Sequence, residues 1–267
     1  MSGVAPPPKQ SYLIWFSQRV GSTVLTQCLE DTGIAGRPRE WLNDAVGAGV
    51  LAKHGVENAF ELRDVLWRDA TTANGVIGLK YGMQARLHRE LTSLFAAVIP
   101  NVPDPEGRKA WDAFFPSCRH VFMTRRNKLR LAVSWWRAIR SGDWHRPSRT
   151  EPTVVDGPTG RAPWKTPPAD LAGHYDARAI EHLMIEADLR EADMQEQFDR
   201  WGLVPHTIVY EDFIARYEPG VRELLDFLHI PGREDIAIPP LAFDQLADEV
   251  SDEWCRRYRS DRAAKSR

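Results

Sequence analysis

The sequence lacks the features that mark several protein classes. Its 267 residues contain only three cysteines, Cys28, Cys118 and Cys255. Their number is odd, and they are not spaced as metal ligands are. No run approaches about eighteen apolar residues, and the Pro-rich residues 1–10 contain no apolar signal-peptide core. We therefore expect free, buried thiols, no metal site, no integral membrane segment and a cytoplasmic protein.

An excess of charge of one sign is missing as well. The chain has 35 Lys and Arg against 37 Asp and Glu, which leaves a net charge of −2. Overall charge gives no reason to expect a nucleic-acid partner, so any anion site has to be built from individual basic side chains. A hydrophobic content of 43% with ten Trp, and no internal repeats, suits a single domain over residues 1–267 with its core in residues 11–262.

The clearest positive signal is a strand, a tight loop and a helix in residues 11–31. The apolar run 12–16 is typical of a buried strand, and apolar residues then recur at the spacing of one helix face, at Val24, Leu25, Cys28 and Leu29. The loop between them consists of Ser17, Gln18, Arg19, Val20, Gly21, Ser22 and Thr23. An ordinary capped helix after a strand remains an alternative explanation of this stretch alone.

This loop has the chemistry of an anion site. The first N–H groups of a helix lack intrahelical partners and point to one place with the positive end of the helix dipole, which favours phosphate or sulfate. Gly21 lets the backbone approach an anion closely, Ser22 and Thr23 add hydroxyl groups, and Arg19 adds a forked positive charge. The loop resembles a nucleotide P-loop in which Gly21 stands where the lysine is needed, so we do not expect a Mg-ATP enzyme.

Further along, short apolar runs alternate with amphipathic segments. Strands are predicted over 76–79, 120–124 and 207–210. Helices are predicted over 57–70, 84–99, 177–201 and 219–229. Two further helices are expected, one after the cap residue Asn127 and one within residues 251–262. This alternation predicts an α/β fold with a P-loop-like central parallel sheet flanked by helices. Residues 141–173 are rich in Pro and Gly and are predicted to form a long irregular insert.

Basic side chains follow two of the predicted strands. Lys80 comes directly after residues 76–79, and Arg125 and Arg126 come directly after residues 120–124. Since ligands of open parallel sheets collect outside the carboxyl ends of the strands, we expect Lys80 in the same crevice as the first loop. Ser134 lies about two turns, ~12 Å, along the next helix, so an arginine before that helix and this hydroxyl could hold one anion between them.

Three stretches together resemble the sulfotransferases that use 3′-phosphoadenosine 5′-phosphosulfate (PAPS). They are the loop 17–23, the segment 125–136 and the segment 208–213, Ile-Val-Tyr-Glu-Asp-Phe. Finer patterns resemble the Stf0 subfamily: Ser-Gln-Arg-x-Gly-Ser-Thr, Gly33-Ile-Ala-Gly36 followed by Pro38-Arg-Glu40, Val133-Ser-Trp-Trp-Arg-Ala138, and the tail Asp252 to Arg259. The resemblance covers about residues 11–262 and implies the sulfotransferase fold.

The resemblance also implies roles in cofactor binding. The loop 17–23 would hold the 5′-phosphosulfate, and Ser134 would hold the 3′-phosphate together with an arginine. Arg125 fits the spacing of the Stf0 group and Arg126 fits that of other sulfotransferases, so both remain open. Tyr210 would lie near the adenine, and we also expect Trp254 to close over the cofactor.

The catalytic residues implied by the resemblance are Glu40, Arg19 and Lys80. Glu40 matches the glutamate proposed as general base in the Stf0 group, and Lys80 matches a strand-end lysine near the transferred group. Gly82 stands where other sulfotransferases carry a catalytic histidine, which favours a carboxylate base. Because a sulfuryl group carries less charge than a terminal phosphoryl group, fixed donors and cations could stabilise its transfer without a metal.

The resemblance further implies a carbohydrate or glycolipid acceptor and suggests a homodimer. Two other functions remain open. The first is a P-loop small-molecule kinase, which would need a carboxylate such as Asp212 for Mg²⁺, and the second is a non-catalytic nucleotide-binding module on the same fold. The missing P-loop lysine argues against the kinase, and the presence of both Glu40 and Lys80 argues against the module.

Overall fold

The computed structural model describes residues 5–43, 49–142, 144, 168–241 and 249–265. Within these residues, parallel strands form a sheet in the order β2-β1-β3-β4. The strands are β1 (Gln10–Phe16), β2 (Val76–Tyr81), β3 (Cys118–Thr124) and β4 (His206–Val209). The predicted α/β fold with a parallel central sheet is thereby confirmed.

Helices occupy most of the remaining described residues. They are α1 (Ser22–Asp31), α2 (Gly49–His54), α3 (Ala59–Asp69), α4 (Ala85–Ala96), α5 (Arg108–Phe114), α6 (Lys128–Ser141), the 3₁₀ helix η1 (Pro168–His174), α7 (Ala177–Trp201), α8 (Tyr210–Ala215), α9 (Tyr217–Phe227) and α10 (Glu249–Lys265). No described helix is long and apolar enough to cross a membrane.

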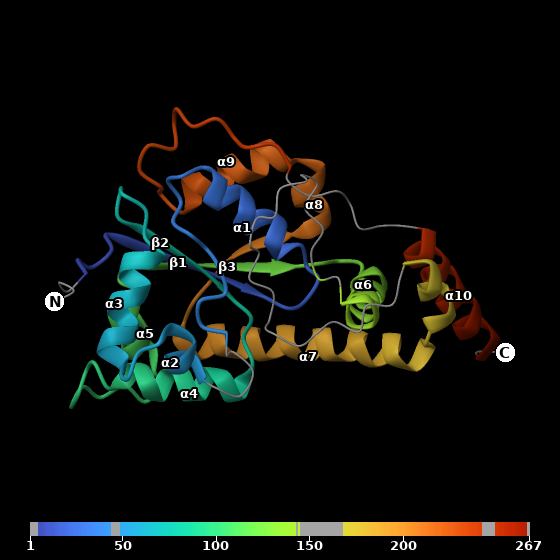
Figure 1. Ribbon diagram of the computed structural model, residues 1–267, viewed down its shortest axis with the longest axis horizontal. Helices are drawn as coiled ribbons and strands as arrows, with labels where there is room; N and C mark the ends of the chain where they lie inside the picture. The colour runs from blue at the N-terminus through green and yellow to red at the C-terminus, as the bar shows by residue number, and fades with distance from the viewer. Residues whose placement is uncertain (1–4, 44–48, 143, 145–167, 242–248, 266–267) are drawn as a thin grey trace.

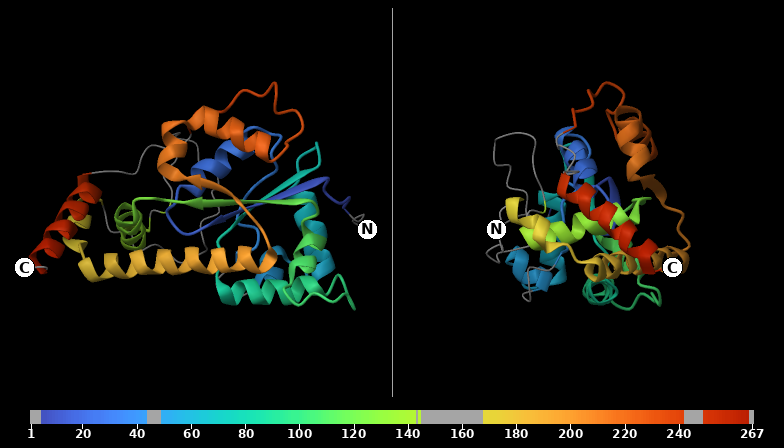
Figure 2. Two further views of the ribbon diagram at one scale, coloured as in Figure 1. Left: turned by 180° about the vertical axis from the view of Figure 1, so that it is seen from behind. Right: turned by 90° about the vertical axis from the view of Figure 1, so that its right-hand side faces the viewer.

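Both faces of the sheet are covered by helices. In Figure 1, α1 and α9 lie on one face and α7 runs along the other, and the reverse view in Figure 2 shows the same layers. Successive residues of β1 alternate between the two cores: Tyr12, Ile14 and Phe16 belong to one buried cluster, and Leu13 and Trp15 to the other. A strand covered on both faces has to be apolar throughout, which explains the continuous apolar run in the sequence.

Local signals fix several helix ends. The side chain of Asn127 accepts a hydrogen bond from the N–H of Arg130 at 3.0 Å, as the predicted cap of α6 requires. Asp176 caps α7 in the same way, and Gly202 ends that helix in the left-handed conformation with φ 60°. The boundaries of α7 match the predicted range 177–201.

Other boundaries differ from the prediction for identifiable reasons. The strand predicted over 76–79 and ending in Lys80 continues to Tyr81, because the backbones of both residues pair with β1. Tyr210 begins α8 and does not end a strand. Helix α5 was not predicted, because its N-cap is Gly107, which has no capping side chain; instead Asp104, three residues earlier, accepts from the N–H groups of Lys109 and Ala110.

Two further expectations concern the insert and the cysteines. Most of the predicted insert, residues 143 and 145–167, lies outside the described residues, and its end forms η1. All three cysteines are free thiols; Cys28 and Cys255 are buried, as predicted, while Cys118 is only partly buried.

Two histidines lie in the aromatic cluster around Trp15 on the α7 side of the sheet. His88 Nδ1 is 3.0 Å from the hydroxyl of Tyr81, and His120 Nδ1 accepts a hydrogen bond from Trp15 Nε1 at 3.0 Å. Burial lowers the pKa of both rings to about 4, so the folded protein holds them neutral at pH 5 to 7.

This pair predicts a loss of stability in mild acid. Below about pH 6.5 a histidine binds a proton in the unfolded chain but stays neutral in the folded protein. Each of the two histidines therefore lowers the free energy of unfolding by about 1.4 kcal/mol for every unit by which the pH falls. Urea unfolding at pH 7, 6 and 5 should show this slope, and His88→Gln should reduce it. A free energy of unfolding that stays constant from pH 7 to 5 would contradict the prediction.

Candidate functional site

The described loops at the carboxyl ends of β1, β2 and β3 meet at one edge of the sheet. Since β2 and β3 lie on opposite sides of β1, the strand order reverses next to β1, and α6 begins where β3 ends (Figure 1). Such a switch point is where ligands of open α/β sheets bind. The loop 17–21, the Lys80 end of β2 and Arg125 all come to this edge.

The loop after β1 has a backbone that only certain residues tolerate. Arg19 and Gly21 have positive φ angles of 64° and 85°. A Cβ atom on Gly21 would lie 2.2 Å from Cδ2 of Tyr210, so the tyrosine ring rests directly on the loop backbone. Gly21 is the N-cap of α1 and offers no capping side chain, which leaves the first N–H groups of α1 without a side-chain partner.

Lys80 connects this loop to the predicted base. Its side chain is 7% exposed, and its Nζ lies 2.7 Å from Oε1 of Glu40 and 3.0 Å from Oγ1 of Thr23. The same ammonium group lies 4.6 Å from the centre of the Phe16 ring. A carboxylate, a cation and the hydroxyl at the start of α1 thus lie in contact.

Glu40 reaches Lys80 because its segment pairs with the edge of the sheet. Arg39 forms an isolated parallel bridge with Leu79, and the N–H of Lys80 donates to the carbonyl of Arg39 at 3.0 Å. The second carboxylate oxygen of Glu40, Oε2, accepts a hydrogen bond from Nδ2 of Asn43. The Glu40 side chain is 23% exposed, so it remains open to a ligand.

Three arginines gather on the other side of the loop. Nε of Arg19 donates to Oγ of Ser134 at 3.0 Å, and Nη1 of Arg125 donates to the carbonyl of Arg19 at 3.2 Å. Burial, followed by the charges of Arg125 and Arg137, lowers the pKa of Arg19 to about 10. Burial also lowers the pKa of Arg125. Like charges held this close are unfavourable in the absence of an anion, so the cluster is suited to bind one.

The two candidate arginines after β3 have different surroundings. Arg125 is 17% exposed, and its guanidinium lies 4.8 Å from the centre of the Tyr210 ring. Arg126 is 62% exposed and forms an ion pair with Asp212 at 2.6 Å. The structure therefore brings Ser134 together with Arg19 and Arg125, whereas Arg126 is engaged with Asp212.

The segment 210–212 holds this arrangement together. Glu211 accepts hydrogen bonds from the N–H groups of Arg126 and Asn127, both at 3.0 Å. Although burial raises the pKa of the Glu211 carboxyl group, these hydrogen bonds outweigh it and the net pKa is lowered. Glu211 thus fixes the turn before α6 while Tyr210 covers Gly21.

The remaining predicted residues take varied positions. Ser17 is fully buried, and its hydroxyl has no hydrogen-bond partner among the described residues, while the Gln18 side chain accepts from Arg190 of α7 at 2.5 Å. Val20 is fully buried in the core. Trp254 is also fully buried, packed in the core cluster that includes α6 and α10, so in this conformation it presents no open ring face to a ligand.

Three residues near the site were not predicted to bind the cofactor or to take part in catalysis, although Arg137 was expected as a possible hydrogen-bond donor to acceptor hydroxyls. Arg137 joins the arginine cluster, Asn43 contacts Glu40, and Glu211 caps the turn of Arg126. Arg137 lies one helical turn from Ser134 on α6, and this spacing could have indicated it. The other two act through contacts between distant segments, which leave no local pattern.

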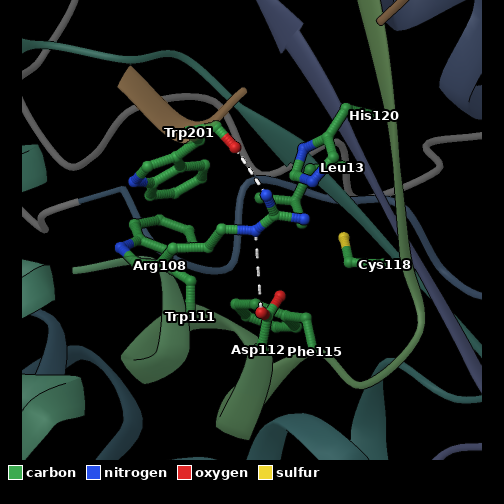
Figure 3. A pocket seen from close by; sticks show the side chains of 8 residues that line it. All are labelled: Leu13, Arg108, Trp111, Asp112, Phe115, Cys118, His120 and Trp201. Atoms are coloured by element: carbon green, nitrogen blue, oxygen red, sulfur yellow. Dashed lines mark hydrogen bonds and ion pairs between the residues drawn. The ribbon is translucent and has the colours of Figure 1, made fainter. Parts of the chain in front are cut away.

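A small pocket lies beside the amino-terminal half of β3, and none of the predicted site residues lines it. Figure 3 shows Arg108 reaching across it to the carbonyl of Trp201 and the carboxylate of Asp112. The other lining residues are Leu13, Trp111, Phe115, Cys118 and His120. Its free volume of about 10 Å³ is room for about one water molecule, so it is not the candidate site.

Comparisons with known proteins found similar sequences. A family model described as Stf0 sulphotransferase matches residues 11–261. The trehalose 2-sulfotransferase of Mycolicibacterium smegmatis is 26% identical over 281 residues, covering 94% of this chain and 95% of that protein. The trehalose 2-sulfotransferase of Mycobacterium tuberculosis is 26% identical over 282 residues, covering 94% of each.

The contact between Gly21 and Tyr210 predicts a large cost for Gly21→Ala. Left-handed backbone alone costs an alanine about 1–2 kcal/mol, and the clash with the ring adds roughly 1–3 kcal/mol. Gly33→Ala is a matched control, because Gly33 has φ 70° but no atom within 4 Å of an added Cβ. Urea unfolding should show a clearly greater loss for Gly21→Ala, and equal losses would contradict this packing.

Proposed function

The chain belongs to the Stf0 sulphotransferase family, and we propose that it transfers the sulfuryl group of PAPS to a hydroxyl of a carbohydrate or glycolipid. The observation that carries this proposal is the contact of buried Lys80 with both Glu40 and Thr23. It joins a potential general base to the loop that suits an anion. A module that only binds anions would not need this carboxylate to be open to a second ligand, and the Glu40 side chain is 23% exposed.

The donor set at the sheet edge fits the two charged ends of PAPS. The loop 17–23, with the uncapped start of α1 and the buried Ser17 hydroxyl, suits the 5′-phosphosulfate. Arg125 and Ser134 suit the 3′-phosphate, and Arg137 would add a second positive charge. Arg125 is a better candidate than Arg126, because Arg126 is exposed and paired with Asp212. Tyr210, which covers Gly21 and Arg125, remains a candidate for the adenine.

When bound, PAPS supplies the sulfuryl group, and the chain's own residues would handle the proton and the charge. Glu40 would take the proton of the acceptor hydroxyl through one of its carboxylate oxygens. Lys80, Arg19 and the N–H groups of the loop would stabilise the negative charge that develops on the oxygen of the leaving nucleotide. Lys80 is suited to both tasks, since it already contacts the base and the start of α1.

The acceptor proposal rests on the relatives and on the open side of Glu40. Both similar proteins are named for the 2-sulfation of trehalose. We propose a small carbohydrate or the sugar part of a glycolipid for this chain, with trehalose as the first compound to test. The proposed homodimer, the cytoplasmic location and the closing role of Trp254 stay predictions.

The kinase alternative is less well supported by the contacts. Asp212, the carboxylate that a Mg²⁺ ion would need, forms an exposed ion pair with Arg126. Among the described residues, no group of three His, Cys, Asp or Glu side chains is arranged to hold a metal. Independence from a metal stays a prediction, to be tested by assaying transfer in the presence of a chelator.

The role of Glu40 can be tested by Glu40→Gln. An amide cannot accept the proton, so turnover should fall by about 10²–10⁴-fold, while the dissociation constant of 3′-phosphoadenosine 5′-phosphate stays within about threefold of wild type. Sulfuryl transfer from labelled PAPS and calorimetric titration measure the two quantities. Equal losses of turnover and nucleotide affinity would show that Glu40 is not the base.

The choice between the two arginines can be tested with Arg125→Ala and Arg126→Ala. Loss of a charge-assisted contact with the 3′-phosphate should weaken nucleotide binding by roughly 10–100-fold in Arg125→Ala. Arg126→Ala removes only an exposed ion pair and should change it little. Adenosine 5′-phosphate, which lacks the 3′-phosphate, should bind wild type and Arg125→Ala almost equally. The opposite ranking of the variants would assign the 3′-phosphate to Arg126.

A further inference from the structure

Glu40 sits at the start of a turn that also contains a side-chain partner for its carboxylate. The N–H of Asn43 lies 3.3 Å from the carbonyl of Glu40, and Nδ2 of Asn43 donates to Oε2 of Glu40. The other carboxylate oxygen, Oε1, faces Nζ of Lys80. The two oxygens of Glu40 therefore have different partners, one neutral and one charged.

We propose that Asn43 is a positioning residue for sulfuryl transfer, holding Glu40 turned so that Oε1 faces Lys80. This role rests on the proposed function of Glu40 as the base. An ionised carboxylate only accepts hydrogen bonds, so the amide of Asn43 has to present its NH₂ group to Oε2. A donor on one oxygen also limits rotation of the carboxylate, which fixes the direction in which the base meets the acceptor.

The turn itself is anchored independently of Asn43. Leu42 is fully buried, and the carbonyl of Glu40 accepts a hydrogen bond from Nζ of Lys53 at 2.7 Å. Ring nitrogen Nε2 of His54 lies 2.8 Å from the carbonyl of Trp41. Because α2 holds the backbone in this way, loss of the Asn43 side chain should affect the carboxylate more than the path of the chain.

The charged and titratable groups around Glu40 come from three elements. They are Lys80 of β2, Lys53 and His54 of α2, and Arg39 of the segment itself, which pairs with Glu30 of α1. Lys80 contacts the carboxylate, whereas Lys53 and His54 bind backbone carbonyls of the turn. Asn43 and Lys80 are thus the described side chains hydrogen-bonded or ion-paired to the carboxylate oxygens, and of the two only Asn43 is neutral.

The test is the pH dependence of turnover in Asn43→Ala and Asn43→Asp. A donor to a carboxylate favours its ionised form, so Asn43→Ala should move the acidic limb of the pH–kcat profile upward by about one pH unit. Asn43→Asp has nearly the same shape but adds a negative charge, so it should move the limb further. At high pH, Asn43→Ala should recover much of its turnover, while its affinity for 3′-phosphoadenosine 5′-phosphate should remain that of wild type.

Asn58→Ala is the matched control for this experiment. Asn58 caps α3 by accepting from the N–H groups of Phe60 and Glu61, and its amide donates to the carboxylate of Glu61. Its loss should lower the melting temperature and leave the acidic limb unmoved. A purely structural effect of Asn43 would give the same result as this control, with reduced stability and an unshifted profile.

The possible outcomes distinguish a failure of the role of Asn43 from a failure of the proposed sulfotransferase function. Wild-type enzyme is first assayed with labelled PAPS and a panel of sugars and glycolipids that includes trehalose. If no acceptor is sulfated, the proposed function fails and the role of Asn43 fails with it. If wild type is active but the acidic limbs of Asn43→Ala and Asn43→Asp coincide with the wild-type limb, only the role of Asn43 is overturned.

Discussion

The arrangement of the site depends on the burial of one positive charge. Lys80 lies near the carboxyl end of the edge strand β2 with 6% of its surface exposed, and a buried ammonium group is costly unless it is paired and hydrogen-bonded. Glu40, Thr23 and the ring of Phe16 meet this need. Because these partners come from three segments, satisfying Lys80 brings the segment 37–43 and the start of α1 to the same sheet edge.

The opposite side of the loop is organised by repulsion between positive charges. Burial, and after it the nearby charges of Arg125 and Arg137, lowers the pKa of Arg19 to about 10. Tyr210 and Glu211 offset part of this cost, and Glu211 also fixes the turn before α6. A bound anion would offset more of this repulsion. The positive charges that destabilise the free site therefore favour a ligand that carries negative charge at both ends. One half of the edge thus holds the proposed base, and the other holds the proposed anion site.

The sequence contains most of the fold but only part of the site. Some features depend on local sequence and were therefore predictable: the buried strands, the strand-loop-helix unit of residues 11–31 and the cap Asn127. Asp176 caps its helix in the same local way but was not predicted. The loop and Lys80 could be placed at one edge because parallel strands end together. The partner of Lys80 could be assigned only by resemblance, since a single bridge from Arg39 to Leu79 brings Glu40 to it. The separation of Arg125 from Arg126, the contact of Asn43 and the cap by Glu211 arise from tertiary packing, which has no periodic signal in the chain.

The central claim is that this edge binds a nucleotide with a 3′-phosphate and transfers its sulfuryl group. Thermal unfolding with 3′-phosphoadenosine 5′-phosphate, and separately with ATP and Mg²⁺, tests it most directly. At a hundred times its dissociation constant a ligand stabilises the fold by ~2.7 kcal/mol, which is a clear rise in melting temperature. The account predicts this rise with the 3′-phosphorylated nucleotide and little change with Mg-ATP. A rise with Mg-ATP alone would contradict it and favour the kinase.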